Sequence, residues 1–477
     1  MTNIYPSMRF GLNTSLLRDI RFWIALFFVV RLVGIANAPL ETGHNWRQSL
    51  TCMISRNFLE IDNNILYPRI DMAGEKTGII GSEFPFFNYL IYLLAEVFGY
   101  EHWYGRLVNL LVSSLGIWHF YRIVLQFFNR EIAFNAAVVL LASIWFAFSR
   151  KIMPDTFSVS LVIAGLFYGI EFLKCEKINA KYAILFTVLC SLGMLVKIPA
   201  LSLFSGLAAL PFIPNIEVKR KILLGGLSTF CLATVFTWYF VWVPHLLETY
   251  RFQLYFPKSL SEGAAEIVPF MALLAEKFYF AALHSYLGFS FALFGLFWFS
   301  RKESKLYITL LCLIILVFGL FILKTGSVFP LHNYYVIPFV PLMALLAAYG
   351  LSKLKRNWQI AGLILICLEG ILNQQHDFFI RPEQVYKSHL ESLTKRTIEP
   401  GEKVIINGEQ SPQDIYFAHC RGWSIDPLQM QNPKYLDSLQ QLGARYAIID
   451  RKHDIALNDS LLYLDAHYRI YRLHSAL

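Results

Sequence analysis

Charged and imidazole side chains gather in a few short stretches of a chain that is otherwise strongly apolar. The first stretch, LETGHNWRQSLTCMISRNF at residues 40–58, holds an acid, an imidazole and an arginine close together. Carboxylates and imidazoles can take a proton from a hydroxyl group, and fixed cations can stabilise negative charge that develops in a reaction. The candidates are, in chain order, Glu41, His44, Arg47, Glu83, Arg150, Lys151, Asp155 and Lys197.

The composition indicates the setting of these residues. Hydrophobic residues make up 56% of the 477 residues and charged residues only 16%, which excludes an ordinary soluble domain. Charge-free runs such as 222–244 and 306–323 are long enough to cross the hydrocarbon core of a bilayer, which takes about 20 helical residues. The seven cysteines form no CxxC motif, so neither a disulfide framework nor a cysteine metal site is expected. The predicted fold class is therefore a polytopic α-helical membrane protein.

The apolar runs predict about 11 transmembrane helices. They are expected near residues 20–37, 104–127, 131–148, 154–173, 180–196, 198–214, 222–244, 282–300, 306–323, 334–350 and 358–374. A further apolar segment, FPFFNYLIYLLAEVFG at residues 84–99, is short and carries Asn88 and Glu96. We expect this segment to be an interfacial amphipathic helix that lies along the membrane surface.

The distribution of lysine and arginine predicts the orientation of these helices. If segment 84–99 does not cross the membrane, one set of termini and short loops holds Arg9, Arg18, Arg21, Arg130, Lys174, Lys177, Lys181, Lys219, Arg220, Lys221, Arg301, Lys302, Lys305, Lys353, Lys355 and Arg356. The opposite short loops hold only Arg150, Lys151, Lys197 and Lys324. The positive-inside rule then places the N-terminus in the cytoplasm and the candidate residues outside, where one cavity could collect them. Because the cytoplasmic loops account for most of the net charge of +9, no nucleic-acid partner is expected.

The last part of the chain, residues 376–477, differs in texture from residues 1–375. KVIING, YAIID and YRIYRL are typical of strands, whereas SPQDIYFAH and NPKYLDSLQQLG are typical of helices. This alternation predicts a small extracytoplasmic α/β domain that follows the transmembrane domain. The domain has neither GxGxxG nor GxxxxGK[ST], so no nucleotide is expected, and its predicted role is structural or in docking an acceptor.

The order of the short motifs along residues 15–375 resembles the GT-C superfamily of integral-membrane glycosyltransferases. Within it the chain is most similar to family 39, which contains protein mannosyltransferases and lipid A aminoarabinose transferases. The motifs that carry the resemblance are GHNWRQ, SEFPFFNYLIYLLAEVFG, GRLVNLL, MPDTF, VKIPAL and HNYYVIPFVPLMALLAAYGL. Where the family usually has Asp-Glu at the start of the outer loop, this chain has His44 and Asn45.

The resemblance implies transfer of a sugar from a polyprenyl-phosphate donor to a hydroxyl group of an extracytoplasmic lipid, glycan or protein, with inversion at the sugar. The leaving phosphate would be met by fixed cations, for which Arg47, Arg150, Lys151 and Lys197 are available. The acceptor hydroxyl would need a base, for which Glu41, His44, Glu83 and Asp155 are candidates. Trp46, His332, Tyr334 and Tyr335 are expected to line the sugar or lipid groove.

Two other functions have a similar composition. A transporter or flippase of lipid-linked sugars would also have many spans, but it would place charges near the bilayer midplane and repeat its halves, and no such repeat is present in the sequence. A polymerase or ligase of surface polysaccharide would not need an acidic, proline-led interfacial helix so early in the chain. No convincing set of metal ligands is seen, and the sequence leaves open a divalent cation held by carboxylates near the phosphate. The expected location is the plasma membrane.

Overall fold

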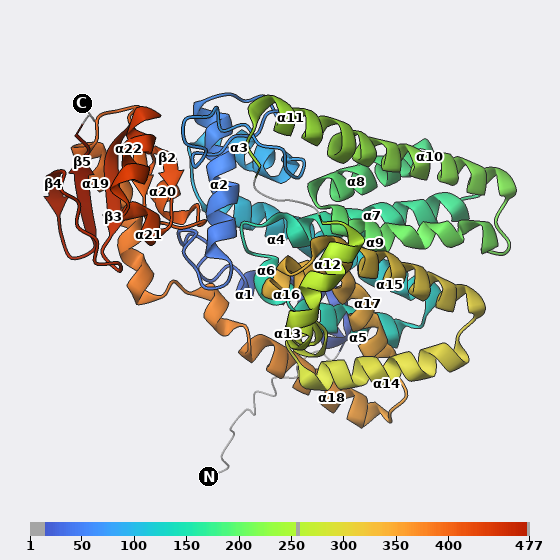
Figure 1. Cartoon of the computed structure of the whole chain (residues 1–477). Helices are drawn as coiled ribbons and strands as arrows, with labels where there is room; N and C mark the ends of the chain where they lie inside the picture. The colour runs from blue at the N-terminus through green and yellow to red at the C-terminus, as the bar shows by residue number, and fades with distance from the viewer. Residues whose placement is uncertain (1–14, 254–257, 475–477) are drawn as a thin grey trace, which may run out of the picture.

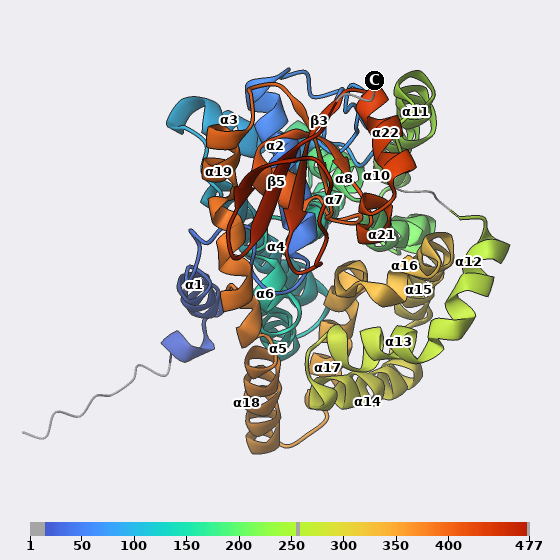
Figure 2. The same ribbon diagram turned by 60° about the vertical axis from the view of Figure 1, so that its left-hand side comes forward.

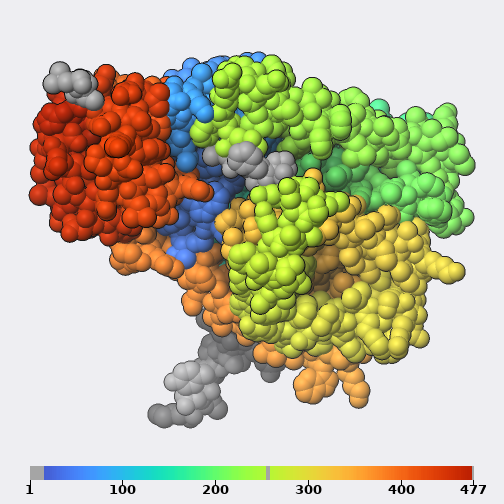
Figure 3. All heavy atoms as spheres, in the orientation of Figure 1, coloured from blue at the N-terminus to red at the C-terminus, as the bar shows by residue number. Residues whose placement is uncertain are grey.

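A computed structural model describes residues 15–253 and 258–474 of the chain. A large helical body holds most of the sequence, and a smaller unit with a β-sheet, formed by the end of the chain, lies against one side of it (Figure 1). The space-filling view shows this smaller unit in contact with the segment coloured blue, which contains α2 (Asn45–Glu60) (Figure 3). The same view shows the surface of the body hollowed between the lime and yellow segments.

The first half of the body contains, besides α2, the helices α1 (Ile20–Val30), α3 (Phe86–Phe98), α4 (Trp103–Phe127), α5 (Arg130–Ala142), α6 (Trp145–Phe148), α7 (Pro154–Lys174), α8 (Ala180–Val196), α9 (Leu201–Phe204), α10 (Val218–Phe236) and α11 (Val243–Tyr250). The second half contains α12 (Leu260–Ile267), α13 (Met271–Glu276), α14 (Tyr286–Lys302), α15 (Lys305–Thr325), α16 (Val328–Leu331), α17 (Val340–Leu351) and α18 (Arg356–Leu372). Short 3-10 or π turns extend several of them, among which η3 (Ser205–Phe212), η4 (Thr237–Trp242), η6 (Lys277–Ala281) and η7 (Asn333–Phe339) matter below.

Five helices of the described chain are long and apolar enough to cross a membrane, namely Trp103–Phe127, Pro154–Lys174, Val218–Tyr250, Lys305–Thr325 and Asn333–Leu351. A sixth span is formed if Leu260–Ala281 and Tyr286–Lys302, which meet at a bend of 91°, are counted together. The chain is thus a multi-pass helical membrane protein, as predicted. Judged by length and composition, the described helices give five or six candidate spans, fewer than the predicted number of about 11.

The difference arises where the apolar runs are interrupted. The run predicted as one span at 131–148 is two helices, α5 and α6, with a break at Ser143. The run at 198–214 is mostly 3-10 helix and contains Pro199 and Pro211. Proline lacks the backbone N–H that an α-helix needs and clashes with the preceding turn, so a run that is apolar throughout is not a continuous α-helix here.

The segment predicted to lie along the membrane surface forms helix α3. Its 13 residues rise about 20 Å at 1.5 Å per residue, which is shorter than the roughly 30 Å hydrocarbon core. The expectation that residues 84–99 form a helix that does not span is therefore supported by its length.

Small residues allow close approach of the helices in the body. Gly295 of α14 faces the backbone of α17, so that a Cβ atom at Gly295 would overlap the carbonyl oxygen of Leu346. Gly350 of α17 likewise faces the carbonyl oxygen of Phe291. Between membrane helices, packing of this kind provides much of the stabilisation, because lipid tails are as apolar as the side chains that they would replace.

The C-terminal unit is a mixed sheet with helices on it. The strands are β1 (Lys403–Ile406), β2 (Arg421–Ser424), β3 (Ala444–Asp450), β4 (Ser460–Leu464) and β5 (Tyr468–Arg472), and the helices are α19 (Leu390–Thr397), α20 (Gln413–Ala418), α21 (Pro427–Met430) and α22 (Pro433–Gln441). The strand order is β2-β1-β3-β5-β4, in which β1 pairs in parallel with β2 and β3, and β5 pairs antiparallel with β3 and β4.

The predicted strands at KVIING, YAIID and YRIYRL are present as β1, β3 and β5, and both predicted helices form. Asn432 caps α22 by accepting a hydrogen bond from the amide of Tyr435, and the helix stops before Gly443, whose φ is 105°. The sequence reading missed β2 and β4. Both are short strands at the edges of the sheet. β2 (RGWS) has no apolar run, and β4 (SLLYL) is apolar but largely exposed, so it lacks the alternation of a strand with one buried face.

The C-terminal unit is fixed by polar contacts to α2 and the residues that follow it. Arg56 of α2 donates to Asp71 at 2.9 Å and to the carbonyl oxygen of Tyr416 at 3.1 Å. His419 hydrogen-bonds with Glu60 of α2 at 2.9 Å and with Glu391 of α19 at 2.8 Å. Figure 2 shows α2 directly behind the sheet. α2 and the end of the chain, far apart in sequence, therefore pack against each other.

The close approach of α14 and α17 predicts a specific sensitivity. We expect Gly295→Val to lower the yield of monodisperse protein and its thermal unfolding midpoint, because the added side chain must push the two helix backbones apart. The matched control is Gly319→Val in α15, where a Cβ atom meets nothing within 4 Å. Fluorescence-detected size-exclusion chromatography after heating measures both variants, and equal loss in the two would contradict the role of Gly295.

Candidate functional site

Four predicted residues from four separate segments meet in one ion-pair network. Arg47 donates to both carboxylate oxygens of Glu83 at 2.8 Å. Lys197 donates to Oε1 of Glu83 at 2.6 Å, and its Nζ lies 3.6 Å from Oδ1 of Asp155. The network therefore alternates cation and anion in the order Arg47, Glu83, Lys197, Asp155.

The local backbone explains how Arg47 and Glu83 reach this place. Gly43 and His44 have φ values of 79° and 58°, and this left-handed turn begins α2, so that Arg47 lies in its first turn. The segment around Glu83 is tied at both sides. The indole of Trp238 donates to the carbonyl oxygen of Ser82 at 3.0 Å, and the amide of Phe84 donates to the carbonyl oxygen of Leu195 at 3.1 Å.

Lys197 and Asp155 stand at helix ends. Lys197 follows the last residue of α8 in an extended conformation (φ −156°, ψ 105°), and Pro199 shortly after it prevents the helix from continuing. Asp155 lies in the first turn of α7, directly after Pro154, and a carboxylate is favoured there by the helix dipole. The hydroxyl of Ser158 donates to the carbonyl oxygen of Gly193 at 2.7 Å, which holds the two helix ends together.

The network is mostly withdrawn from solvent. The side chains of Arg47, Lys197 and Asp155 are 13%, 7% and 4% exposed, and that of Glu83 is 29% exposed. Burial opposes ionisation of Glu83, but Arg47 and Lys197 beside it hold the pKa of its carboxyl well below its usual range. Oδ2 of Asp155 is buried and accepts no hydrogen bond within the described part of the chain.

A small cavity lies beside these ion pairs. Its lining includes Arg47, Glu83, Pro154 and Val196, and its volume is about 20 Å³. A water molecule needs about 10–15 Å³ by this measure, so the cavity has room for little more than one. The paired charged side chains therefore fill most of the centre of the site.

The predicted groove residues form an aromatic wall next to the cations. Nζ of Lys197 lies 5.4 Å and 5.5 Å from the ring centres of Tyr334 and Tyr335. The rings of His332 and Tyr334 stack at 5.4 Å, and Trp46 lies 5.6 Å from His332. Eight of the predicted site residues, including these, are thus brought to one place.

His44 joins the same wall, with its ring 4.9 Å from Tyr334 and 5.4 Å from His332. Burial, together with the nearby His332 and Lys151, lowers the pKa of His44 to about 3. The imidazole is therefore neutral near pH 7 and has a lone pair that can accept a proton.

Glu41, Arg150 and Lys151 do not join the network. Glu41 is fully buried and pairs with Arg150 at 3.0 Å and with Arg106 at 3.3 Å. Lys151 donates to the carbonyl oxygens of Thr42 and Gly43 at 2.7 Å and 3.0 Å. Its Nζ also lies 3.3 Å from Asp377. These contacts hold the start of the outer loop against the turn at 149–153.

The sequence reading assigned no role to several residues that support the site. Arg106 and Asn109 both lie in the GRLVNLL motif. The side-chain amide of Asn109 donates to the carbonyl oxygens of Phe148, Lys151 and Met153 at 2.9–3.1 Å. Lys277, buried in η6, donates to Asn333 at 2.5 Å beside the aromatic wall. A polar or charged residue inside an apolar run was the available signal, because it is costly unless it has a partner.

No metal ligand set was found. In residues 15–253 and 258–474, no group of three or more His, Cys, Asp or Glu side chains is close enough to hold a metal ion. The buried carboxylates of the site are instead paired with arginine and lysine, and no residues of the site are assigned to a divalent cation.

Comparison with known proteins gives the class. Residues 82–242, which contain Glu83, Asp155 and Lys197, match the family described as dolichyl-phosphate-mannose-protein mannosyltransferase. No curated protein matches the chain by sequence. The resemblance expected from the motifs is confirmed over this segment, which matches a family of membrane glycosyltransferases.

The fold agrees with this class over almost the whole chain. The crystal structure of ArnT from Cupriavidus metallidurans bound to undecaprenyl phosphate superposes with a TM-score of 0.63 at 12% identity, covering 96% of this chain and 99% of ArnT. The oligosaccharyltransferase AglB from Archaeoglobus fulgidus, in complex with an inhibitory peptide and a dolichol-phosphate, gives 0.57 at 12% identity and covers 91% and 70%. The arabinofuranosyltransferase AftD from Mycobacteria gives 0.55 at 14% identity and covers 95% and 41%.

The placement of Glu41 predicts that its removal affects stability first. Glu41→Ala leaves Arg106 and Arg150 buried without their carboxylate, and breaking a buried pair in this way typically costs about 3–5 kcal/mol. We expect a clear fall in the thermal unfolding midpoint of the purified protein. Glu131→Ala, which breaks the more exposed pair with Arg356, is the control and should cost less than about 1 kcal/mol. A Glu41→Ala protein as stable as the control would contradict the structural role assigned to Glu41.

Proposed function

We propose that the protein transfers a sugar from a polyprenyl-phosphate donor to a hydroxyl group of an extracytoplasmic acceptor, with inversion at the sugar carbon. The observation that carries this proposal is the meeting of Arg47, Glu83, Asp155 and Lys197 at helix ends beside an aromatic wall. The family match and the shared fold support a donor of this class, since ArnT was seen with undecaprenyl phosphate and AglB with a dolichol-phosphate.

Arg47 and Lys197 are proposed to bind the donor phosphate. As the bond from the sugar carbon to the phosphate oxygen breaks, negative charge grows on the phosphate, and preorganised cations stabilise that transition state more than the ground state. Glu83 holds both cations in place by direct hydrogen bonds. Lys277, which is buried and bonds Asn333 beside the aromatic wall, adds a further positive charge near the same place.

His44 is proposed as the base that takes the proton from the acceptor hydroxyl. Glu41 is locked between two arginines, and Glu83 is paired with two cations, so neither carboxylate is available to an acceptor. His44 is neutral and only partly buried. A donor phosphate bound beside it would favour the imidazolium and raise its pKa toward the working range. Asp155 is then left to orient Lys197 and the acceptor.

Tyr334, Tyr335, His332 and Trp46 are proposed to hold the sugar. Their ring faces present apolar surface to the C–H groups of a pyranose, and the tyrosine hydroxyls can bond its hydroxyl groups. Direct displacement by one acceptor oxygen, with one base, leaves no covalent intermediate and therefore inverts the configuration.

The proposal predicts the behaviour of the site variants in a transfer assay. Purified protein is incubated with radiolabelled polyprenyl-phosphate monosaccharides and membrane extract, and release of polyprenyl phosphate is measured. We expect Arg47→Ala, Glu83→Ala, Asp155→Ala and Lys197→Ala each to lose about 100-fold or more in kcat, as removal of one charge-stabilising donor typically does. His44→Ala should lose a comparable factor.

The control for this assay is Lys181→Ala, which removes an exposed lysine at the other end of α8. Each variant is first checked for a monodisperse size-exclusion profile, so that a folding defect is not read as a catalytic one. Lys197→Arg, which keeps the charge, should fold and recover part of the activity. Normal turnover in three of the four network variants would remove the site assignment.

The finer topology is also part of the proposal. We place the N-terminus in the cytoplasm. Residues 1–14, which include Arg9, lie outside the residues that the structure describes. We place about 11 spans in residues 1–375, in a plasma membrane, and residues 376–477 outside it. The close packing of the C-terminal unit on α2 supports one common compartment for both.

Cysteine labelling tests this orientation. In intact cells, a membrane-impermeant maleimide should label single cysteines placed at the exposed positions Glu75 and Leu428, and it should not label those at Lys219 and Lys302 until the membrane is opened. The wild-type chain, with its native cysteines, serves as the blank. The reverse pattern would overturn the topology.

A further inference from the structure

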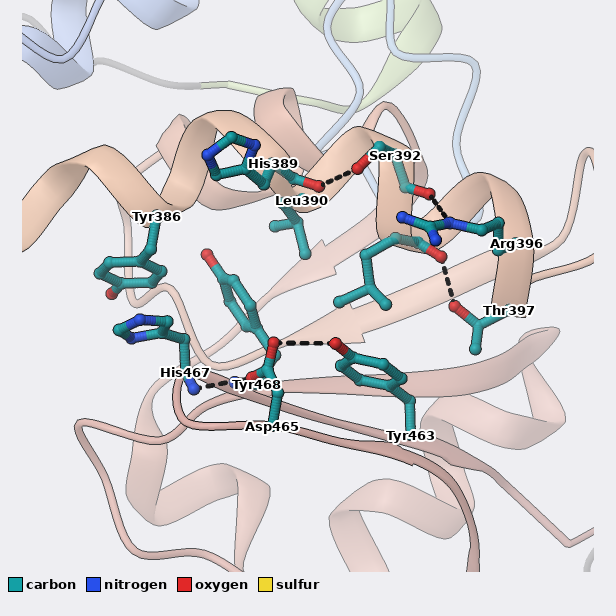
Figure 4. Close-up of a pocket in the computed structure, with 11 residues that line it drawn as sticks. Tyr386, His389, Leu390, Ser392, Arg396, Thr397, Tyr463, Asp465, His467 and Tyr468 are labelled. Carbon is teal, nitrogen blue, oxygen red and sulfur yellow. Dashed lines mark hydrogen bonds between the residues drawn. The ribbon is translucent and has the colours of Figure 1, made fainter.

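The C-terminal unit contains a pocket that is separate from the ion-pair network. Its volume is about 340 Å³, at the lower end of the roughly 300–1,000 Å³ of small-molecule sites. One wall is the helical segment η9 (Pro382–His389) with α19, and the other wall is formed by β4, β5 and the turn between them (Figure 4). The residues that line it are Tyr386, His389, Leu390, Ser392, Leu393, Arg396, Thr397, Tyr463, Asp465, His467 and Tyr468.

The floor of the pocket carries a polar group without a partner. Tyr468 is only 2% exposed, and its hydroxyl forms no hydrogen bond with any of the residues that the structure describes. Figure 4 shows its ring rising from β5 into the space between the two walls. A buried hydroxyl without a partner is costly, and a ligand hydroxyl in the pocket would relieve that cost.

One side of the pocket is an aromatic platform. The rings of Tyr386 and His467 stack in parallel, with centres 4.3 Å apart and an interplanar angle of 11°. The hydroxyl of Tyr386 donates to Asp450 at 2.6 Å, so this ring is held in place. His467 stacks on this ring and is itself exposed, so the pair presents aromatic surface at the pocket. Aromatic surface of this kind suits the C–H side of a sugar ring.

The opposite side of the pocket is polar and carries the charged side chains of Asp465 and Arg396. The hydroxyl of Tyr463 donates to Oδ2 of Asp465 at 2.9 Å, while Oδ1 accepts from the amides of His467 and Tyr468 at 2.7 Å each. Arg396 lines the rim from α19. A fixed carboxylate repels a phosphate, whereas acceptors and donors side by side match the hydroxyl groups of a carbohydrate.

From these features we propose that this pocket binds a pyranose sugar, which stacks on the Tyr386 and His467 pair and bonds the hydroxyl of Tyr468 and the carboxylate of Asp465. The sugar would belong to the acceptor, so that the acceptor is a glycan or glycolipid. This second step rests on the proposed transferase function, whereas sugar binding by the pocket does not. The pocket lies on the unit that His419 and Arg56 hold against α2, at the edge of the sheet that β4 and β5 form.

Saturation-transfer NMR tests the pocket with the full chain in lipid nanodiscs, because maltoside detergents carry sugars of their own. The probes are glucose, galactose, mannose, N-acetylglucosamine and glucuronic acid, each titrated alone. We expect at least one of them to bind. His467→Ala should weaken that binding about tenfold and Tyr468→Phe about threefold. His453→Ala, which removes an exposed histidine of the same unit outside the pocket, should leave it unchanged.

Two results would overturn the pocket assignment, namely no binding by any of the five sugars, or equal binding by wild type and His467→Ala. Lys197→Ala separates this proposal from the transferase proposal, because it should abolish transfer and still bind the sugar. In the transfer assay, His467→Ala should raise KM for the acceptor and leave kcat unchanged. A fall in kcat with an unchanged KM would instead contradict the link between the pocket and the acceptor.

Discussion

The contact of the Glu83 carboxylate with Arg47 and Lys197 is the interaction around which the proposed active site is organised. Neither cation is more than 13% exposed, and taking charges out of water is costly unless each has a partner. The first turn of α2, the segment before α3, the end of α8 and, through Asp155, the start of α7 must therefore come together. Misplacing any one of them leaves a buried charge unpaired.

The need to pair every buried charge also accounts for a second buried cluster, in which Glu41 pairs with Arg106 and Arg150. There the charges are fully enclosed, and their partners are other parts of the scaffold. The two clusters use the same residue types but differ in access. The network at Glu83 borders an aromatic wall and is partly open, whereas the cluster at Glu41 has no exposed atom to offer a ligand. The exposure of their side chains, more than their charge, distinguishes the proposed catalytic site at Glu83 from the structural cluster at Glu41.

The arrangement also explains how a membrane enzyme can act on two chemically different substrates. In the proposed function, a lipid-linked donor reaches Arg47 and Lys197 from the membrane. A hydrophilic acceptor would come from the layer formed by the outer loop and the C-terminal sheet. The neutral His44 lies at the junction, on the aromatic wall next to Lys197. A carbohydrate pocket on the C-terminal unit would fit this division, because it would hold the acceptor on the aqueous side.

The sequence by itself determined the membrane class, the resemblance to a glycosyltransferase family, the short helix at 84–99, most of the C-terminal sheet and four members of the network. Apolar runs, cap residues and charges at helix ends are local signals, and they depend little on the rest of the chain. The sequence did not separate Glu41, Arg150 and Lys151 from Glu83 and Lys197, because all five are charges at the ends of apolar runs. It also missed Arg106 and Lys277. Only the tertiary structure decided which charges pair with each other, because ion pairing acts over a few ångströms between segments that are distant in sequence.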